Sequence, residues 1–250
     1  EPFEAIFEGY AGNYVYVGSR RDRLYFRTDY KAPNGKLIEV DPREDGTFSV
    51  HVVVPEREQA LERASVLANK FFVTYIQDVH HDVLIFDEHG KQIGEVETPG
   101  VGSVLGFDGK ESDQSTYFSY TDFVTPHTMF HYDIAKHETT LFRKPETNFD
   151  PDSFTVRQVL YSSKDGTRVP MFIAHRSDID PKQAPCYLYG YGGFNVALTP
   201  EFLTSRIAWL ELGGVFVVAN IRGGSEYGEK WHEAGMLRKK QNSFDDFIAA

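Results

Sequence analysis

The sequence has little cysteine, few basic residues and no long apolar run. Cys186 is the single cysteine among 250 residues, which excludes an intrachain disulfide and a cysteine metal site, and its apolar surroundings predict a small buried side chain. The net charge of -11 argues against nucleic acid, whose binding needs clustered lysine and arginine. No segment approaches the roughly 20 apolar residues that span a bilayer, and the N-terminal residues 1–8 lack the features of a signal peptide. We therefore expect a soluble protein that binds neither nucleic acid nor membranes.

A second absence concerns catalysis. No serine has glycine both two residues before and two residues after it, so the chain contains no GxSxG nucleophile motif. Ser225 comes closest, but its second glycine, Gly228, is one residue too far along, and we interpret this segment as a turn. The nine histidines show no metal-ligand spacing and are interpreted as scattered surface residues. We expect neither a metal site nor a cofactor.

The first half contains a repeat. Similar strands end at Asp41, Asp87 and Asp133, which are 46 residues apart both times (87 minus 41, and 133 minus 87). Four antiparallel strands in a period of about 40 to 50 residues are typical of a propeller blade. Three blades cannot close a ring, because propellers have roughly 4 to 8. We expect further blades before Glu1 or from another chain, and truncation is the simpler account. The predicted strands are 14–17, 24–29, 36–41, 48–54, 64–68, 72–78, 83–87, 92–97, 103–106, 116–122, 129–133 and 139–142.

The second half has a different pattern. Residues 144–153 are polar and contain proline, which predicts a linker, and we place a partial propeller at 1–146 and an α/β domain at 147–250. A hairpin (154–161 and 167–174) and a strand (185–189) precede a helix at 200–212, with Thr199 as cap and Pro200 at its first position. A strand at 214–220 follows. The last helix is expected to begin at Ser243, with Asp245 and Asp246 serving as capping and dipole-complementing residues.

A glycine-rich turn follows the strand at 185–189. In Gly190-Tyr191-Gly192-Gly193-Phe194 the glycines allow close approach of the backbone to a ligand. Acyl transfer needs donors that stabilise negative charge on a carbonyl oxygen, and in α/β hydrolases one donor comes from such a loop. The Tyr191 hydroxyl could be that donor, and Phe194 could offer a flat apolar face to a substrate. The spacing alone does not separate these roles from simple packing against the loop.

Arg222 precedes two further glycines. A basic residue there could bind a substrate carboxylate, but we favour a buried ion pair with the helix that carries Asp245 and Asp246.

Four segments make the chain resemble the prolyl oligopeptidase family: residues 187–195, 217–232, 240–247 and 161–172. The resemblance implies the last three or so blades of a seven-bladed propeller, followed by the first part of an α/β-hydrolase peptidase domain. It implies that Tyr191 helps to form the oxyanion hole and that Phe194 lines the pocket for the substrate proline. It also implies that Gly190, Gly192 and Gly193 shape this site and that the catalytic triad lies beyond Ala250.

The resemblance predicts a serine endopeptidase that cleaves proline-containing oligopeptides, with these 250 residues inactive alone. It implies a monomer when complete and a cytoplasmic location, or a periplasmic one in a bacterium. Oligopeptidase B shares Gly-Tyr-Gly and Ile-Arg-Gly-Gly but lacks the Gly-Gly-Phe pattern of residues 192–194, which favours the proline-specific branch. Three alternatives remain: oligopeptidase B, an aminopeptidase of the same build, and a non-catalytic propeller binding module.

Overall fold

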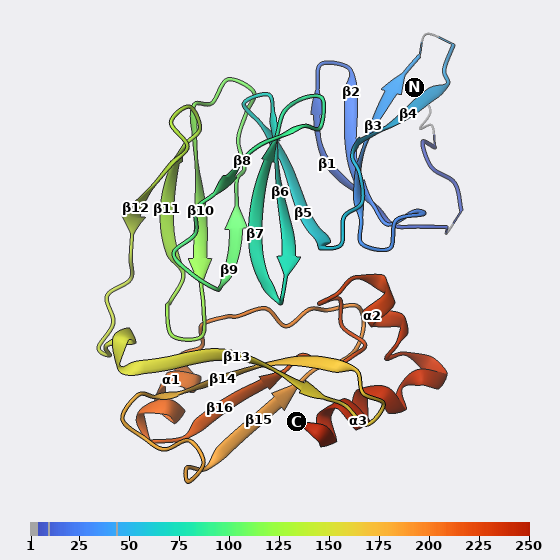
Figure 1. Cartoon of the computed structure of the whole chain (residues 1–250). Coiled ribbons are helices and arrows are strands. Elements are labelled where there is room, and N and C mark those ends of the chain that lie inside the picture. The colour runs from blue at the N-terminus through green and yellow to red at the C-terminus, as the bar shows by residue number, and fades with distance from the viewer. Residues whose placement is uncertain (1–4, 10, 44) are drawn as a thin grey trace.

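The computed structural model describes residues 5–9, 11–43 and 45–250. Three antiparallel sheets stand side by side above a fourth sheet that is flanked by helices (Figure 1). Residues 1–4, which contributed to the argument against a signal peptide, lie outside the described residues. In the described residues, no helix combines the length and the apolar character needed to cross a membrane.

Each of the first three sheets has four strands that pair in chain order, as expected for propeller blades. This confirms the three blades that the repeat predicts. The predicted strands are all present and differ from the observed ones by a few residues at their ends. The strands are β1 (Tyr14–Arg20), β2 (Arg23–Thr28), β3 (Lys36–Pro42), β4 (Phe48–Val54), β5 (Ala60–Leu67), β6 (Lys70–Gln77), β7 (His80–Phe86), β8 (Gln92–Val96), β9 (Ser103–Gly106), β10 (Ser115–Thr121), β11 (Thr128–Asp133) and β12 (Glu138–Arg143).

The blades pack face to face through apolar side chains that alternate along the strands. On β6, Phe71 packs in the cluster shared with the first blade, and its ring lies 4.9 Å from that of Tyr25. The next residue, Phe72, faces the third blade and stacks on Phe107 at 5.3 Å. Because successive side chains of a strand point to opposite faces, the middle blade is buried on both sides, and six consecutive β6 residues are buried.

The fourth sheet mixes antiparallel and parallel strands. Its order is β13 (Phe154–Ser162), β14 (Arg168–Arg176), β16 (Val215–Ala219) and β15 (Cys186–Gly190), and β15 and β16 are parallel. The predicted hairpin and both predicted strands are confirmed. The remaining elements are η1 (Pro151–Ser153), α1 (Thr204–Glu211), α2 (Glu229–Glu233), η2 (Leu237–Lys239) and α3 (Gln241–Ala249).

Both predicted helix starts are wrong. Helix α1 begins at Thr204 rather than Pro200, because the preceding residues bond to the third blade instead of to a helix. The Ser103 hydroxyl donates to the Pro200 carbonyl at 2.6 Å, and the Phe202 amide donates to Thr121 Oγ1 at 3.2 Å. Leu203 occupies the N-cap without a side-chain hydrogen bond, so Thr199 does not cap this helix.

The capping box expected at the last helix is also absent. Helix α3 begins at Gln241, and the Ser243 hydroxyl, inside its first turn, donates to the Arg222 carbonyl at 2.6 Å. Asp246 is buried and bonds to Arg222 rather than capping the helix. Asp245 accepts a hydrogen bond from Gln241 on the same helix at 3.0 Å.

Cys186 is exposed, contrary to the expectation that it is buried. It lies on β15, which among the described strands pairs only with β16. Apolar composition of the segment indicates a strand, but burial depends on what covers that strand.

The part of the chain that holds the fourth sheet and its helices is called the lower domain. Each blade contacts it through the turn that joins the second and third strands of the blade. In the first blade, the Pro33 carbonyl accepts a hydrogen bond from the Glu229 amide at 3.0 Å. In the second and third blades, Val79 and Phe123 belong to the same buried cluster as Phe172 of β14. Val79 has a φ of 66°, which is unusual for a β-branched residue. Its side chain is completely buried in this cluster.

Candidate functional site

The glycine-rich turn lies at the carboxyl edge of the parallel strand pair. Residues 191–194 follow β15, and residues 220–224 follow the neighbouring strand β16. In open α/β sheets, ligands bind beyond the carboxyl ends of the parallel strands. The structure thus brings the two glycine-rich turns of the sequence together at one edge.

Glycine is required where these two turns touch. A Cβ atom on Gly192 would lie 2.4 Å from the carbonyl oxygen of Arg222, and one on Gly223 would lie 2.2 Å from that of Gly192. Gly190 is less tightly enclosed, since the nearest atom to its Cβ would be on the Phe247 ring at 3.0 Å. Gly193 is open, and its nearest neighbour would be the Lys240 ammonium at 4.0 Å. The three glycines therefore have different surroundings, and Gly192 is the one whose contacts leave no room for a side chain.

Tyr191 and Phe194 both extend away from the packed interior. Their exposed fractions are 38% and 86%. Phe194 and Asn195 adopt left-handed φ angles of 55° and 57°, which turn the chain sharply after the glycines. Within the described residues, the Tyr191 hydroxyl makes no hydrogen bond and the Phe194 ring stacks on no other ring. Both side chains are therefore accessible within the described structure.

A cavity of about 430 Å³ opens beside this turn. The turn forms one wall and helix α3 forms the other. The lining is mainly apolar, and Tyr191, Lys240 and Ser243 are the lining residues with polar side chains. The lining residues that lie outside the turn are Ile221, Lys240, Ser243, Phe244, Phe247 and Ile248.

Arg222 is the centre of a buried polar network beneath the turn. Its guanidinium donates to Asp246 of α3 at 2.6 Å and to Asp165 of the β13–β14 turn at 2.6 Å. The Ser163 hydroxyl donates to the Asp246 carboxylate at 2.5 Å, and the Tyr161 hydroxyl donates to the Asp246 backbone carbonyl at 2.9 Å. The hydrogen bonds with Asp246 raise the pKa of Arg222, and the hydrogen bond from Arg222 lowers the pKa of Asp165. The buried ion pair predicted for Arg222 is confirmed, and its partner on the helix is Asp246.

Two side chains from the C-terminal helices hold the turn from outside. The Lys240 ammonium donates to the Gly192 carbonyl and lies 3.3 Å from Ser243 Oγ. Nδ1 of His232, on α2, lies 2.7 Å from the Gly223 carbonyl oxygen. This oxygen also accepts a hydrogen bond from the Asn195 amide at 3.3 Å. The sequence indicates no role for Lys240, because no local pattern links residue 240 to residue 192.

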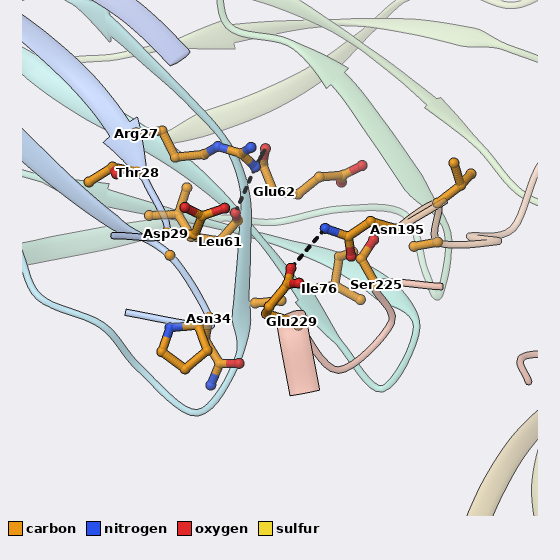
Figure 2. Close-up of a pocket in the computed structure, with 16 residues that line it drawn as sticks. Arg27, Thr28, Asp29, Asn34, Leu61, Glu62, Ile76, Asn195, Ser225 and Glu229 are labelled. Atoms are coloured by element: carbon orange, nitrogen blue, oxygen red, sulfur yellow. Dashed lines mark hydrogen bonds between the residues drawn. The ribbon is translucent and has the colours of Figure 1, made fainter. Parts of the chain in front are cut away.

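Ser225 lies apart from the cavity beside Tyr191. It lines a polar cavity of about 330 Å³ between the first two blades and the lower domain. In Figure 2, Arg27 and Glu62 approach this cavity from the blades, and Asn195 donates to Glu229 at 3.1 Å on the opposite side. In the described part of the chain, no histidine or carboxylate bonds to the Ser225 hydroxyl. This arrangement agrees with the interpretation of Ser225 as a turn residue.

Glu226, next to Ser225, is a fully buried carboxyl group that sequence reasoning also missed. One oxygen accepts from the Leu198 amide at 3.1 Å and lies 3.4 Å from Asn220 Nδ2, while the other has no hydrogen-bond partner among the described residues. Burial raises the pKa of Glu226 to about 7. No periodicity in the sequence marks this position as buried.

Two histidines, His81 and His175, depart from the expected surface placement because both are buried. His81 is buried, its Nε2 lies 2.6 Å from Glu62 Oε2, and its Nδ1 contacts the Val104 backbone. It therefore bridges the second and third blades. Over the residues that the structure places, no three or more His, Cys, Asp or Glu side chains are grouped so that they could hold a metal ion.

Two family models match this chain. The model described as the N-terminal beta-propeller domain of prolyl oligopeptidase matches residues 1–145, and the prolyl oligopeptidase family model matches residues 200–250. A prolyl endopeptidase of Elizabethkingia meningoseptica is 37% identical over 99% of this chain. The chain spans only 35% of the length of that relative.

Solved structures of this build superpose closely. One, from a structural and mechanistic study of two prolyl endopeptidases, has a TM-score of 0.90 and 38% identity over 98% of this chain and 36% of its own. Prolyl oligopeptidase B of Galerina marginata, bound to a 35mer hydrolysis and macrocyclization substrate, has a TM-score of 0.90 and 30% identity. That match covers 98% of this chain and 35% of the Galerina chain.

Proposed function

The chain belongs to the prolyl oligopeptidase family, and on that premise we propose that the full-length protein is a serine endopeptidase that cleaves short peptides on the carboxyl side of proline. The observation that carries the proposal is the turn at residues 190–194. It places an exposed tyrosine hydroxyl and an exposed phenylalanine ring beside an apolar cavity at the carboxyl edge of the sheet. Similarity to named prolyl endopeptidases along nearly the whole chain supports the same conclusion.

Tyr191 acts on the carbonyl oxygen of the scissile bond. The nucleophilic serine, which residues 1–250 do not supply in a GxSxG motif, attacks the carbonyl carbon while a base takes its proton. The negative charge that develops on the oxygen is stabilised by the Tyr191 hydroxyl, which has no competing hydrogen bond among the described residues. As this intermediate collapses, the base gives its proton to the leaving nitrogen and the C–N bond breaks, which releases the amine and leaves an acyl-enzyme that water hydrolyses.

Phe194 and the cavity provide the apolar surface for the substrate proline. The Phe194 ring is 86% exposed and belongs to the same turn as Tyr191, so one short segment contacts both the carbonyl of the scissile bond and the proline side chain of the substrate. Gly192 holds the turn against Arg222, Gly190 leaves room for the Phe247 ring, and Gly193, which faces open space, shapes the site through its backbone alone.

The blades form part of a seven-bladed propeller that restricts entry to peptides. We place the domain boundary between residues 146 and 147, within the stretch of irregular backbone that separates β12 from η1. The Galerina enzyme bound to a 35mer supports oligopeptides as the class of substrate. We further assign the full-length protein to the cytoplasm as a monomer, and cell fractionation with light scattering tests both assignments.

The oxyanion role is tested by Tyr191→Phe in the full-length protein. Loss of one preorganised donor should lower kcat by about 10- to 1000-fold. Tyr189→Phe is the matched control, because Tyr189 has a similar exposed fraction and lies on β15 just before the turn, so this variant should keep its activity. An unchanged rate in Y191F would remove Tyr191 from this role.

The substrate class is tested by comparing cleavage after proline with cleavage after arginine. A preference for proline supports the proposal, whereas a preference for arginine would assign the protein to oligopeptidase B. Failure to cleave either peptide would favour a propeller module without catalytic activity.

A further inference from the structure

Lys240 occupies an unusual position for a lysine. It is half-buried between η2 and α3, and its ammonium donates to the Gly192 carbonyl and approaches Ser243 Oγ at 3.3 Å. Among the residues that the structure describes, no carboxylate lies within 4 Å of this ammonium to form an ion pair. The cation therefore bonds to the backbone of the turn that carries Tyr191.

Helix stability does not account for a cation at this position. Lys240 is the N-cap of α3, where the positive end of the helix dipole disfavours positive charge. It makes no side-chain capping bond to the helix. Its neighbours Arg238 and Lys239 are exposed to solvent, whereas the Lys240 side chain turns toward Gly192.

The turn needs an external support because its own residues provide little stiffness. Gly190, Gly192 and Gly193 surround Tyr191, and glycine has the widest choice of backbone conformations. The Tyr191 hydroxyl has no hydrogen bond in the described chain, so its position depends on the backbone on either side. Just after the turn, the Asn195 amide and His232 both contact the Gly223 carbonyl. Within the turn, Lys240 holds the carbonyl of Gly192, the residue directly after Tyr191.

Lys240 is in turn joined to the rigid interior. Ser243 Oγ, which lies 3.3 Å from the Lys240 ammonium, donates to the Arg222 carbonyl at 2.6 Å. The Arg222 side chain is locked to Asp246 and Asp165. A charge-assisted hydrogen bond is roughly twice as strong as a neutral one, so the ammonium is an effective clamp on a single carbonyl.

We propose that Lys240 is a positioning residue for acyl transfer, whose ammonium holds the Gly192 carbonyl and thereby keeps the Tyr191 hydroxyl where the oxyanion forms. The proposal rests on the function proposed above for Tyr191. Lys240 does not touch the reacting atoms, and its effect on the rate passes through Tyr191.

A double-mutant cycle in the full-length protein tests this coupling. Lys240→Met, Tyr191→Phe and the double variant are assayed on a proline-containing peptide at a temperature at which circular dichroism shows each one folded. A displacement of the oxyanion donor by about 1 Å can cost on the order of 100-fold, so K240M should lower kcat by about 10- to 100-fold with little change in KM. In the Y191F background the same substitution should change kcat by less than about 3-fold, because the donor that it positions is already absent.

Two control variants separate positioning from general stability. Lys240→Arg keeps a cationic donor and should recover most of the rate. Lys239→Met removes an exposed charge one residue away and should leave kcat unchanged. An unchanged kcat in K240M, with Y191F impaired, would overturn the inference while leaving the proposed function intact. An equal loss in both backgrounds would also overturn it, and an active Y191F would overturn the role of Tyr191 and the inference together.

Discussion

The guanidinium of Arg222 and the carboxylate of Asp246 form a buried ion pair in which Nη2 lies 2.6 Å from Oδ1. Their exposed fractions are 5% and 0%. The Arg222 amide also donates to Asp246 at 2.9 Å, so both the side chain and the backbone of the turn bind one carboxylate. Through this pair, helix α3 sets the position of the turn against which Gly192 packs.

Breaking this pair should destabilise the lower domain. Asp246→Asn leaves the buried Arg222 charge without its main partner, which costs about 3 to 5 kcal/mol for buried pairs. The thermal midpoint of the full-length protein should fall by several degrees. Asp245→Asn is the matched control, because Asp245 lies 3.9 Å from the exposed Lys164 and such pairs contribute about 0 to 1 kcal/mol. Equal midpoints for D246N and D245N would contradict the importance of the buried pair.

Adjacent glycines of the turn should respond differently to alanine. In Gly192→Ala the new Cβ would lie 2.4 Å from the Arg222 carbonyl, so the turn must move and carry Tyr191 with it. We expect kcat to fall by about 100-fold, because displacement by about 1 Å has effects of that size. Gly193→Ala meets open space and should keep activity within about 3-fold of the original. Equal losses in the two variants would show that flexibility, rather than contact with Arg222, sets the requirement.

Glu226 should make stability depend on pH. Burial raises its pKa to about 7 in the folded state, whereas an unfolded glutamate titrates near 4.3. Between these values the folded state keeps a proton that the unfolded state releases, so stability falls as pH rises from about 4.5 to 7, by about 3 kcal/mol in total. Glu226→Gln removes this titration, and its melting temperature relative to the original protein should rise across the same window.

The control for this experiment is Glu233→Gln, on the exposed side of α2. Its melting temperature should follow that of the original protein at every pH. If the difference between E226Q and the original protein stays constant from pH 4.5 to 7, Glu226 does not titrate within that window.

The blades and the turn at residues 190–194 were predictable because the sequence patterns that indicate them are local. Alternating apolar residues determine the two faces of a strand, and the repeated aspartates at 41, 87 and 133 identify three copies of one unit. The turn at residues 190–194 was recognisable because glycines follow an apolar strand. The pairing of Arg222 with α3 was also anticipated, since a buried cation needs a carboxylate and one lay on the next predicted helix.

Other features depend on partners distant in the chain. The start of α1 was set by hydrogen bonds to Ser103 and Thr121 of the third blade, which no local capping signal reveals. The exposure of Cys186 depends on which segments cover β15, and the local apolar composition does not indicate this. The burial of Glu226 and His81 likewise depends on neighbouring segments that pack over them.

The sequence by itself thus determined the blade repeat, the α/β pattern after it and the turn that carries Tyr191, because backbone periodicity and glycine content act over a few residues. The tertiary structure alone decided what holds that turn in place. Lys240 lies 48 residues from Gly192 in the chain, and Arg222 lies 57 residues from Asp165. Such contacts form only when the folded sheet and helices bring distant charges and carbonyls together.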